Sequence, residues 1–479
     1  MPNKMLGFVT TGRRMPEKRK AEARRHDFRE IHGRFDEAGA GEQAGRCSQC
    51  GIPYCQLHCP VQNNIPDWLK LVAEDRLEEA YEVSSATNDF PEICGRICPQ
   101  DRLCEGSCVI EQSTHGAVTI GQVERFITDT AWERGWVKPP APPRERPQSV
   151  GIIGAGPAGM AAAGQLRRLG YQVSLYDRHD RLGGLLIYGI PGFKLEKDVV
   201  ARRVELLAAA GVALHPNFEV GRDASLAELQ SRHDAVLIAT GVYRARDLGV
   251  PGQELAGIVP ALDYLIASNR KDLGDAVPAW DDGTLNAAGK HVVVIGGGDT
   301  AMDCVRTAVR QGAASVKCLY RRDRANMPGS QREVAHAEEE GVDFVWQAAP
   351  DAFVGEGGRV RAIEAHRIHL GVADASGRRT PQRIAGSTFA VPCDLAVKAL
   401  GFDPEPVAER FGAPDLKLSR WGTVVVNPRT LMTSLEGVFA AGDIVRGASL
   451  VVNAIKDGRD AAARIHGWLQ GEALAQAAD

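Results

Sequence analysis

Long apolar runs are missing from this chain of 479 residues. No stretch of about 18 uncharged apolar residues occurs, so the sequence predicts no membrane-spanning helix. Residues 1–16 include basic side chains but lack the apolar segment that a secretory signal needs. The net charge of −4 at pH 7 gives no indication of nucleic-acid binding. These absences predict a cytoplasmic protein with no membrane and no nucleic-acid partner.

Cysteine is scarce outside one segment. Of the 11 cysteines, Cys304, Cys318 and Cys393 stand alone in apolar or strand-like surroundings, which is typical of buried, unreactive thiols. The others form the runs Cys47-x2-Cys50-x4-Cys55-x3-Cys59 and Cys94-x3-Cys98-x5-Cys104-x3-Cys108. Because the cytoplasm is reducing, disulfide bonds are disfavoured for these thiols and metal binding is favoured.

The spacing of this cysteine segment suits two metal centres of four thiolates each. Proline follows Cys59 and Cys98, as in the Cys-Pro step of bacterial ferredoxins. Zinc also takes four cysteines and would fit Cys47 and Cys50, but zinc sites usually show two such tight pairs and only one is present. Iron–sulfur clusters are the preferred interpretation and zinc is the alternative. The spacing alone does not divide the thiols between two centres.

Residues 149–178 have the pattern of a strand, a glycine loop, a helix and a second strand. Gly154 permits the tight turn, Gly156 lets the backbone approach a pyrophosphate, and Gly159 lets the helix pack on the strand. The helix N-terminus offers N–H groups to phosphate. Asp177 ends the second strand, where a carboxylate can bind ribose hydroxyls. This complete unit predicts a dinucleotide site.

Residues 291–322 repeat the plan. The loop and helix start supply the candidates Gly296, Gly298, Asp299, Thr300 and Ala301. The acid is replaced by Arg321 and Arg322, whose guanidinium groups can bind a 2′-phosphate, so the unit predicts NADPH rather than NADH. The alternative is that both arginines are solvated loop charges. Asp299 and Thr300 also suit a purely capping role.

Three shorter patterns organise the rest of the chain. Residues 17–38 have apolar side chains at helical spacing and predict a charged amphipathic arm with a solvated face. Helical spacing recurs at 66–83 and 120–134. The proline-rich run at 138–147 predicts a stiff linker that ends an N-terminal helical domain.

The segments RLGGL at 181–185, ATG at 239–241 and GVFAAGD at 437–443 resemble the flavoprotein family that has two dinucleotide-binding domains. The resemblance implies an NADPH domain inserted into a split FAD domain. It implies the FAD-binding residues Gly154, Gly156, Pro157, Ala158, Gly159, Asp177, Gly184, Leu185, Thr240, Gly241, Gly442 and Asp443. No cysteine lies between Gly154 and Cys304, which excludes a disulfide reductase. Lys194 has two interpretations, a residue near the flavin or a surface lysine.

The segments QAGRCSQCGIPYC at 43–55, NNIP at 63–66, GRICP at 95–99 and CEGSC at 104–108 resemble the small (β) subunits of NADPH-dependent glutamate synthases. The resemblance implies two 4Fe–4S clusters that exchange ligands across the segment. It assigns Cys47, Cys50, Cys55 and Cys108 to the first cluster and Cys59, Cys94, Cys98 and Cys104 to the second. Related modules occur in dihydropyrimidine dehydrogenase, whose second cluster has a non-cysteine ligand, and in bifurcating ferredoxin–NADP oxidoreductases.

The sequence therefore predicts an α/β protein whose helical iron–sulfur domain precedes two Rossmann-like domains. Expected boundaries are 1–147 for the 4Fe–4S domain, 148–288 and 402–479 for the FAD domain, and 289–401 for the NADPH domain. Electrons from NADPH are expected to pass through FAD and two clusters to a large (α) subunit with glutaminase, FMN and 2-oxoglutarate sites. A bifurcating NADP–ferredoxin oxidoreductase subunit and a zinc-stabilised redox-sensing adaptor are the alternatives.

Overall fold

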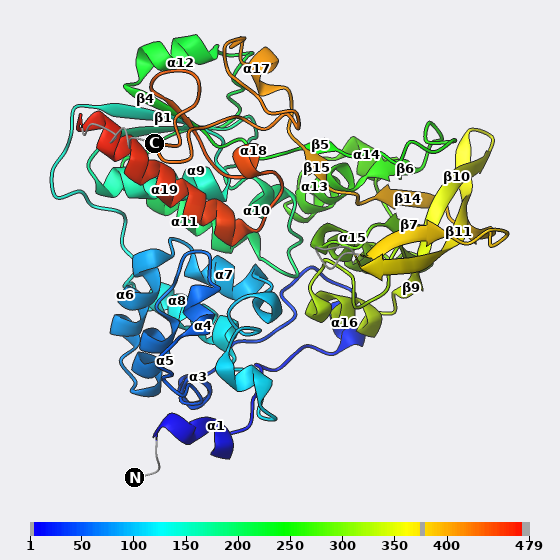
Figure 1. Cartoon of the computed structure of the whole chain (residues 1–479), viewed down its shortest axis with the longest axis horizontal. Helices are drawn as coiled ribbons and strands as arrows, with labels where there is room; N and C mark the ends of the chain where they lie inside the picture. The colour runs from blue at the N-terminus through cyan, green and yellow to red at the C-terminus, as the bar shows by residue number, and fades with distance from the viewer. Residues whose placement is uncertain (1–3, 374–378, 472–479) are drawn as a thin grey trace.

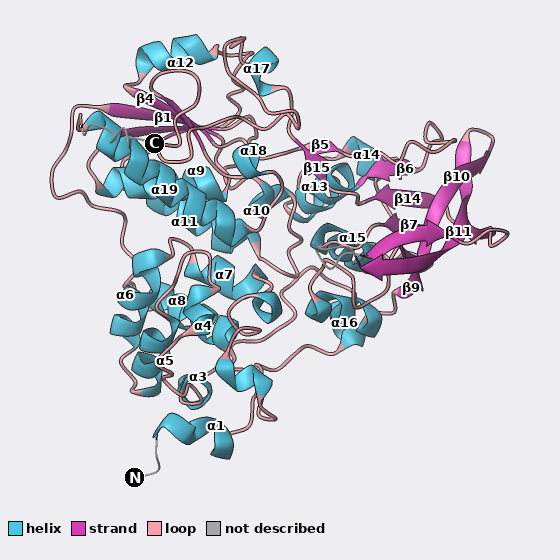
Figure 2. Cartoon of the chain, viewed as in Figure 1, coloured by secondary structure: helices cyan, strands magenta, loops and turns pink. Residues whose placement is uncertain are grey.

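The computed structural model describes residues 4–373 and 379–471. Figure 1 shows a helical module at the lower left, a parallel-sheet unit above it, and a second parallel-sheet unit to the right that carries a long antiparallel extension. Helices flank both parallel sheets in Figure 2. This architecture confirms the predicted fold class. Within the described ranges, no helix is long and apolar enough to cross a membrane.

The N-terminal module consists of short helices around one long one. Its helices are α1 (Gly7–Thr10), α2 (Ala21–Arg24), α3 (Glu37–Ala44), α4 (Tyr54–Leu57), α5 (Ile65–Ala73), α6 (Leu77–Thr87), α7 (Pro91–Ile97) and α8 (Ile120–Glu133), with 3₁₀ turns at Lys4–Leu6, Gln100–Arg102 and Val109–Gln112. The apolar stripe of α8 buries Val123, Phe126 and Ile127 against Trp68 and Leu69 of α5. The helix predicted at the end of the module is confirmed.

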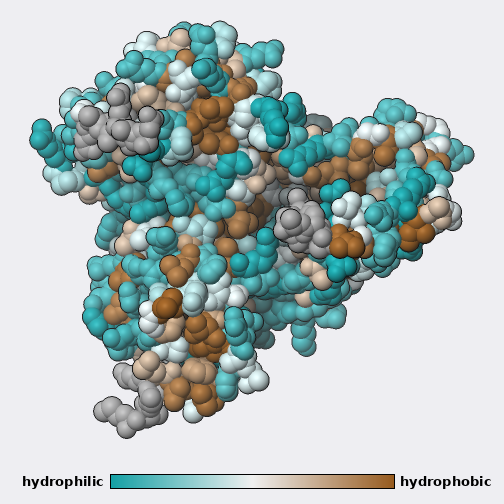
Figure 3. Space-filling view, in the orientation of Figure 1, coloured by the Kyte–Doolittle hydropathy of each residue, from teal (hydrophilic) through white to brown (hydrophobic). Residues whose placement is uncertain are grey.

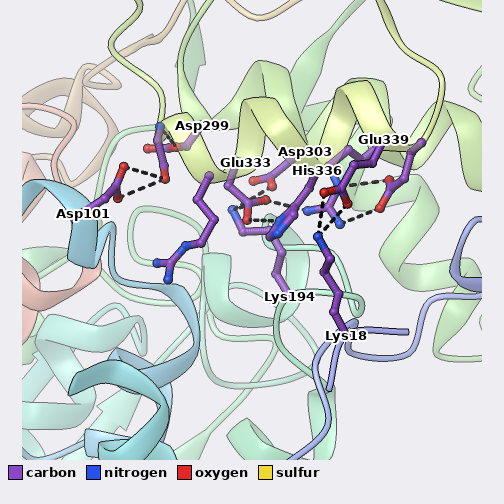
Figure 4. A network of polar contacts seen from close by, with 12 residues as sticks. Lys18, Asp101, Lys194, Asp299, Asp303, Glu333, His336 and Glu339 are labelled. Atoms are coloured by element: carbon purple, nitrogen blue, oxygen red, sulfur yellow. Dashed lines mark hydrogen bonds and ion pairs between the residues drawn. The ribbon is translucent and has the colours of Figure 1, made fainter. Parts of the chain in front are cut away.

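The arm predicted over residues 17–38 is wrong in its helical form. Only α2 and the first residues of α3 are helical there, because the arm folds back on itself, with a bridge between Lys18 and His32, and its side chains bind the second parallel-sheet unit. Arg24 is fully buried and donates to Glu340, which Arg306 and Arg310 also contact. Burial alone would raise the pKa of Glu340, but the guanidinium groups of Arg310 and Arg306 outweigh it and lower the pKa to about 2. Figure 4 shows Lys18 of the arm against Glu339 at the same contact.

The first parallel-sheet unit has the strand order β16-β4-β1-β2-β3, all parallel. The strands are β1 (Ser149–Ile153), β2 (Gln172–Tyr176), β3 (Ala213–His215), β4 (Ala235–Ile238) and β16 (Val438–Ala440). The helices are α9 (Pro157–Arg168), α10 (Leu185–Tyr188), α11 (Lys197–Ala209), α12 (Leu226–Arg232), α17 (Val407–Arg410), α18 (Asp443–Arg446) and α19 (Val451–Leu469). Because β16 returns to this sheet after the second unit, the predicted split of the first unit is confirmed.

The second parallel-sheet unit has the order β6-β14-β7-β8-β9. Its strands are β6 (Ile258–Pro260), β7 (His291–Ile295), β8 (Ser315–Tyr320), β9 (Asp343–Trp346) and β14 (Leu395–Lys398), and its helices are α13 (Ala261–Asp272), α14 (Pro278–Asp281), α15 (Asp299–Arg310) and α16 (Gln331–Glu339). The antiparallel extension contains β10 (Ala348–Glu356), β11 (Arg359–Ala373), β12 (Arg379–Arg383) and β13 (Phe389–Pro392). Strands β5 (Arg244–Ala245) and β15 (Phe402–Asp403) pair where the chain passes between the units.

One predicted boundary needs correction. The sequence predicts that the first unit extends to residue 288, yet β6 pairs with β14 of the second sheet. The second unit therefore begins before Ile258. No glycine fingerprint accompanies β6, and a three-residue strand shows too little alternation to be recognised from the sequence.

Candidate functional site

The first glycine loop is packed too tightly for a side chain at two of its three glycines. Gly154 has φ +103°, and a Cβ there would lie 2.5 Å from the carbonyl oxygen of Ala239. A Cβ on Gly159 would lie 1.9 Å from the carbonyl oxygen of Gly154. A Cβ on Gly156, in contrast, would meet nothing within 4 Å. The loop thus presents open space at the N-terminus of α9, where a phosphate group would be stabilised.

A cavity opens from this loop along the first unit. It is lined by the predicted FAD residues Gly154, Gly156, Pro157, Ala158, Asp177, Leu185, Thr240, Gly241 and Asp443. Gly184 and Gly442 adjoin this lining, with positive φ angles and Cβ positions tight against Gly156 and Ala158. The hydroxyl of Thr240 is buried and has no partner within the described ranges, so a bound group is the natural acceptor for its hydrogen. The residues present fit FAD.

Asp177 is held firmly at the end of β2. Its Oδ2 accepts from the N–H of Ala155 at 2.8 Å, and its Oδ1 accepts from the N–H of His179 at 2.9 Å. The carboxylate lines a second cavity that continues the first one past Tyr243 to Arg410. Sequence reasoning missed Tyr243 and Arg410, because the family motifs do not include them. Two joined cavities suit an extended dinucleotide.

Asp443 lies at the first position of α18, where the helix N-terminus favours a negative charge. Its Oδ1 accepts from the hydroxyl of Ser449 at 2.6 Å. Burial raises the pKa of Asp443, and the hydrogen bond from Ser449 partly counters the shift. The carboxylate is thus fixed in the same cavity as Leu185 and Thr240, which the resemblance also assigns to FAD binding.

The second glycine loop has the same construction. Gly296 has φ +149°, and a Cβ there would lie 2.3 Å from the carbonyl oxygen of Ala399, whereas Gly298 faces open space. Ala301 is fully buried beneath the loop, and the half-buried Thr300 follows Asp299 in the first turn of α15. Asp299 Oδ1 accepts from the N–H of Ser330 at 2.9 Å. This open loop at a helix N-terminus fits the pyrophosphate of NADPH.

Arg321 and Arg322 directly follow β8, which runs parallel to β7 and beside it. The carboxyl ends of these two strands lie at one edge of the sheet, so the arginines and the glycine loop share that edge. Arg321 is exposed and Arg322 is half-buried. Their position is compatible with contact to a 2′-phosphate on a nucleotide held by the loop.

The structure gathers the eight segment cysteines around two separate cavities. The first is lined by Cys47, Cys50, Cys55 and Cys108, and the second by Cys59, Cys94, Cys98 and Cys104. Burial raises the pKa of Cys47 to about 11 and that of Cys55 and Cys59 to about 12, so metal binding has to displace their protons. Nowhere in the described chain do three or more His, Cys, Asp or Glu side chains converge as they would on a single metal ion. The thiols surround cavities instead.

Glu124 of α8 also lines the second cavity, and sequence reasoning missed it because only cysteines were counted. The side-chain amides of Asn63 and Asn88 each donate to its Oε1 at 3.2 Å. Burial raises the pKa of Glu124 to about 8. A buried carboxyl is usually paired with a cation or bound to a metal. The second cavity therefore offers one donor more than a four-iron cluster takes.

The FAD cavity and the two cysteine cavities follow one another closely. Val451 of α19 lines the FAD cavity, and its neighbour Val452 lines the second cysteine cavity. Ile120 lines both cysteine cavities. Cys55 and Cys59, which face different cysteine cavities, are four positions apart in the chain. Single side chains thus separate neighbouring sites.

Both interpretations of Lys194 need correction. It lies outside the FAD cavity and is half-buried where all three parts of the protein meet, in a cavity that Cys98 and Asp299 also line. Its Nζ donates to Asp303 Oδ1 at 2.9 Å and lies 4.0 Å from Glu333 Oε2. Burial lowers the pKa of Lys194, but the two carboxylates outweigh burial and raise it above the ordinary value. Figure 4 shows Lys194 pointing between Asp303 and Glu333.

Comparison with known proteins gives the same division of the chain. A family model described as dihydropyrimidine dehydrogenase domain II, 4Fe-4S cluster, matches residues 24–136, and one described as pyridine nucleotide-disulphide oxidoreductase matches residues 148–458. The glutamate synthase [NADPH] small chain of Azospirillum brasilense is 70% identical over 475 residues, which cover 99% of this chain and 98% of that protein. The glutamate synthase [NADPH] small chain of Escherichia coli (strain K12) is 45% identical over 474 residues, which cover 98% and 100%.

Among solved structures, Mycobacterium tuberculosis FprA in complex with NADPH has a TM-score of 0.57 at 21% identity, and the match covers 68% of this chain and 87% of that chain. This likeness shows the fold alone. The fold, the nucleotide loops and the cysteine cavities define the class: an NADPH-dependent flavoprotein oxidoreductase with an iron–sulfur module. Within that class, the chain belongs to the family of glutamate synthase [NADPH] small chains.

Proposed function

We propose that this chain works in the cytoplasm as the electron-input subunit of glutamate synthase. It oxidises NADPH and delivers the electrons to a large subunit that holds the glutaminase, FMN and 2-oxoglutarate sites. The observation that carries the proposal is the order of the cavities, in which Val451 and Val452 join the FAD cavity to the second cysteine cavity and Ile120 joins that one to the first.

Each site has its proposed residues. FAD is held by the residues of the first glycine loop together with Asp177, Thr240 and Asp443. NADPH is held by the second glycine loop together with Arg321 and Arg322. The first 4Fe–4S cluster takes Cys47, Cys50, Cys55 and Cys108, and the second takes Cys59, Cys94, Cys98 and Cys104. Bound FAD would supply a hydride acceptor for NADPH, and bound clusters would supply single-electron transfer. The protein contributes position and exclusion of water rather than a general base.

The first cysteine cavity lies next to the surface, and its surroundings suit a protein partner. Ile52 and Leu57 are each 58% exposed, and Tyr54 and Val109, which line the cavity, are also exposed. Apolar side chains gathered on a surface mark protein–protein contacts. Figure 3 shows apolar residues on the visible face of the helical module. Electrons that reach this cluster have a short way out to a docked subunit.

Purification from the host tests the proposal. We expect flavin, iron and acid-labile sulfide in the protein, reduction of an artificial one-electron acceptor by NADPH, and co-purification of the large subunit. Zinc in place of sulfide would contradict the cluster assignment. Recovery of a different flavoprotein in place of the large subunit would assign the chain to a bifurcating NADP–ferredoxin oxidoreductase.

A charged residue at the proposed docking surface tests binding of the large subunit separately from oxidation of NADPH. Leu57→Asp should reduce co-purification of the large subunit and glutamate formation at least about fivefold, while the rate with the artificial acceptor stays within twofold, because a docking side chain that is lost typically costs about 1–3 kcal/mol. The matched control is Trp421→Asp, since Trp421 is 65% exposed on the first parallel-sheet unit and lines no cysteine cavity described above. Equal losses in both variants would refute docking at this surface.

A further inference from the structure

The segment Pro328–Arg332 connects the second glycine loop with the module that holds the cysteines. On the nucleotide side, the N–H of Gly329 donates to the carbonyl of Gly297 at 3.0 Å. The N–H of Ser330 donates to Asp299 Oδ1 at 2.9 Å. The segment therefore rests directly on the loop that is expected to hold the pyrophosphate of NADPH.

The same segment contacts the chain between Cys98 and Cys104 on its other side. The hydroxyl of Ser330 donates to Asp101 Oδ1 at 3.1 Å, so that this buried serine joins Asp101 to Asp299. Figure 4 shows these two acids close to one another, on different parts of the protein. The Arg102 guanidinium donates to the carbonyl of Pro328. No residue of the FAD cavity takes part in these contacts.

Arg332 carries the contact to the peptide groups around the second cavity. Its guanidinium donates to the carbonyl of Cys98 at 3.4 Å and to the side-chain oxygen of Gln100. Both acceptors are neutral oxygens, so they do not cancel the positive charge that Arg332 places beside the cysteine loop.

Gln100 forms hydrogen bonds with several backbone groups of the cysteine loop. Its side-chain amide donates to the carbonyls of Cys94 at 3.2 Å and Gly95 at 3.0 Å, and its own carbonyl accepts from the N–H of Glu105 at 2.9 Å. Gln100 is almost completely buried. Arg332 thus contacts the peptide of Cys98 directly and, through the side chain and backbone of Gln100, the peptides that bear or adjoin Cys94 and Cys104.

We propose that Arg332 is a positioning residue that sets the reduction potential of the second cluster and couples it to the nucleotide loop. This inference rests on the proposed function. A positive charge and donated hydrogen bonds close to a cluster favour its reduced, more negative state and raise its potential. Because one segment contacts both sites, NADP⁺ binding shifts that potential, and linkage requires cluster reduction to change NADP⁺ affinity by the same factor.

Potentiometric titration followed by electron paramagnetic resonance tests the coupling in the complete enzyme. Cys104→Ser identifies the signal of the second cluster by its loss. Arg332→Gln should lower the midpoint potential of that signal and leave the first cluster unchanged, whereas Arg332→Lys should retain most of the wild-type potential. NADP⁺ should shift the second-cluster signal in the wild type and not in Arg332→Gln.

Two further variants separate the effect of the Arg332 charge from that of the hydrogen bond between Ser330 and Asp101. Ser330→Ala keeps the guanidinium and the backbone hydrogen bonds and removes only the hydroxyl bond to Asp101, so the potential should stay near that of the wild type while the response to NADP⁺ becomes smaller. Arg361→Gln removes an exposed arginine of the same unit, which pairs with Asp394, and should change neither property. Flavin and iron content confirm that each variant is folded and loaded.

Two results would overturn the coupling: an unchanged potential in Arg332→Gln, or a wild-type signal that does not respond to NADP⁺. Failure of the proposed function is recognised separately. In that case the wild type lacks two cluster signals, or NADPH does not reduce its flavin, before any variant is compared.

Discussion

Replacing Gly458 with alanine tests how closely α19 has to approach α9. A Cβ at position 458 would lie 2.1 Å from the carbonyl oxygen of Ala158 and 3.1 Å from its Cα. Both atoms belong to the backbone of α9, so no side-chain rotation relieves the overlap. The alanine therefore forces α19 away from α9.

The size of the effect follows from two opposing contributions. Forced overpacking costs about 1–3 kcal/mol, whereas alanine is favoured over glycine inside a helix by about 0.5–1 kcal/mol. We expect a net loss of about 1–2 kcal/mol, and each kcal/mol lowers the Tm of a unit of about 150–250 residues by about 2–4 °C. Flavin retention should fall as well, because Val451 and Ala454 of α19 line the FAD cavity.

Thermal unfolding followed by flavin fluorescence, together with flavin content after gel filtration, measures both effects. Gly164→Ala is the matched control, since Gly164 is a buried glycine of α9 whose added Cβ would lie 3.6 Å from Leu207 Cδ2, an ordinary contact. This control should keep its flavin and gain about 0.5–1 kcal/mol. If Gly458→Ala behaved like Gly164→Ala, the reasoning about close helix approach would be refuted.

Three other predictions concern nucleotide choice, cluster ligation and acid stability. Alanine at both Arg321 and Arg322 should raise the KM for NADPH far more than that for NADH, and equal increases would show that these arginines do not contact the 2′-phosphate. The four-thiol assignment predicts that Cys94→Ala loses the second cluster and Glu124→Gln keeps it; iron and sulfide analysis checks this, and the reverse result would assign the fourth position to the carboxylate. Glu340→Gln should destabilise the protein by about 3–5 kcal/mol at pH 7, because buried guanidinium groups lose their carboxylate. Since the pKa of Glu340 is lowered from 4.5 to about 2, its contribution is complete above pH 4.5 and is lost as the pH falls toward 2, so denaturant unfolding of wild type and variant should converge on acidification and a constant difference would contradict the assignment.

The glycine loops and the cysteine segment could be predicted because their information is local. Gly154 and Gly159 lie within one strand–turn–helix, where sequence spacing fixes spatial position. Glu124 could not be found in this way, since no spacing rule connects one glutamate in a regular helix to a distant cysteine. Its role becomes visible only when α8 is packed against α7.

Lys194 shows a second limit of sequence reasoning. A lysine that follows a turn resembles a solvated one, and its partner Asp303 lies on α15 of a different unit. The same holds for Arg24 of the arm, since the helical spacing there predicts a solvated face whereas its carboxylate partner is Glu340. Pairing between units depends on how the units dock, and periodicity within one segment contains no information about docking.

The wall that α19 contributes to the second cysteine cavity has a consequence for how the protein is assembled. Phe90 and Ile93 of the N-terminal module share one apolar core with α9 and α19, and Val452 closes the cavity from that side. The ribosome delivers the cysteines long before it delivers this helix. Iron and sulfide that enter the second cavity earlier would remain open to solvent and oxygen. We therefore expect a cluster in the second cavity to be completed only after the flavoprotein fold has formed, and the N-terminal module by itself not to retain it.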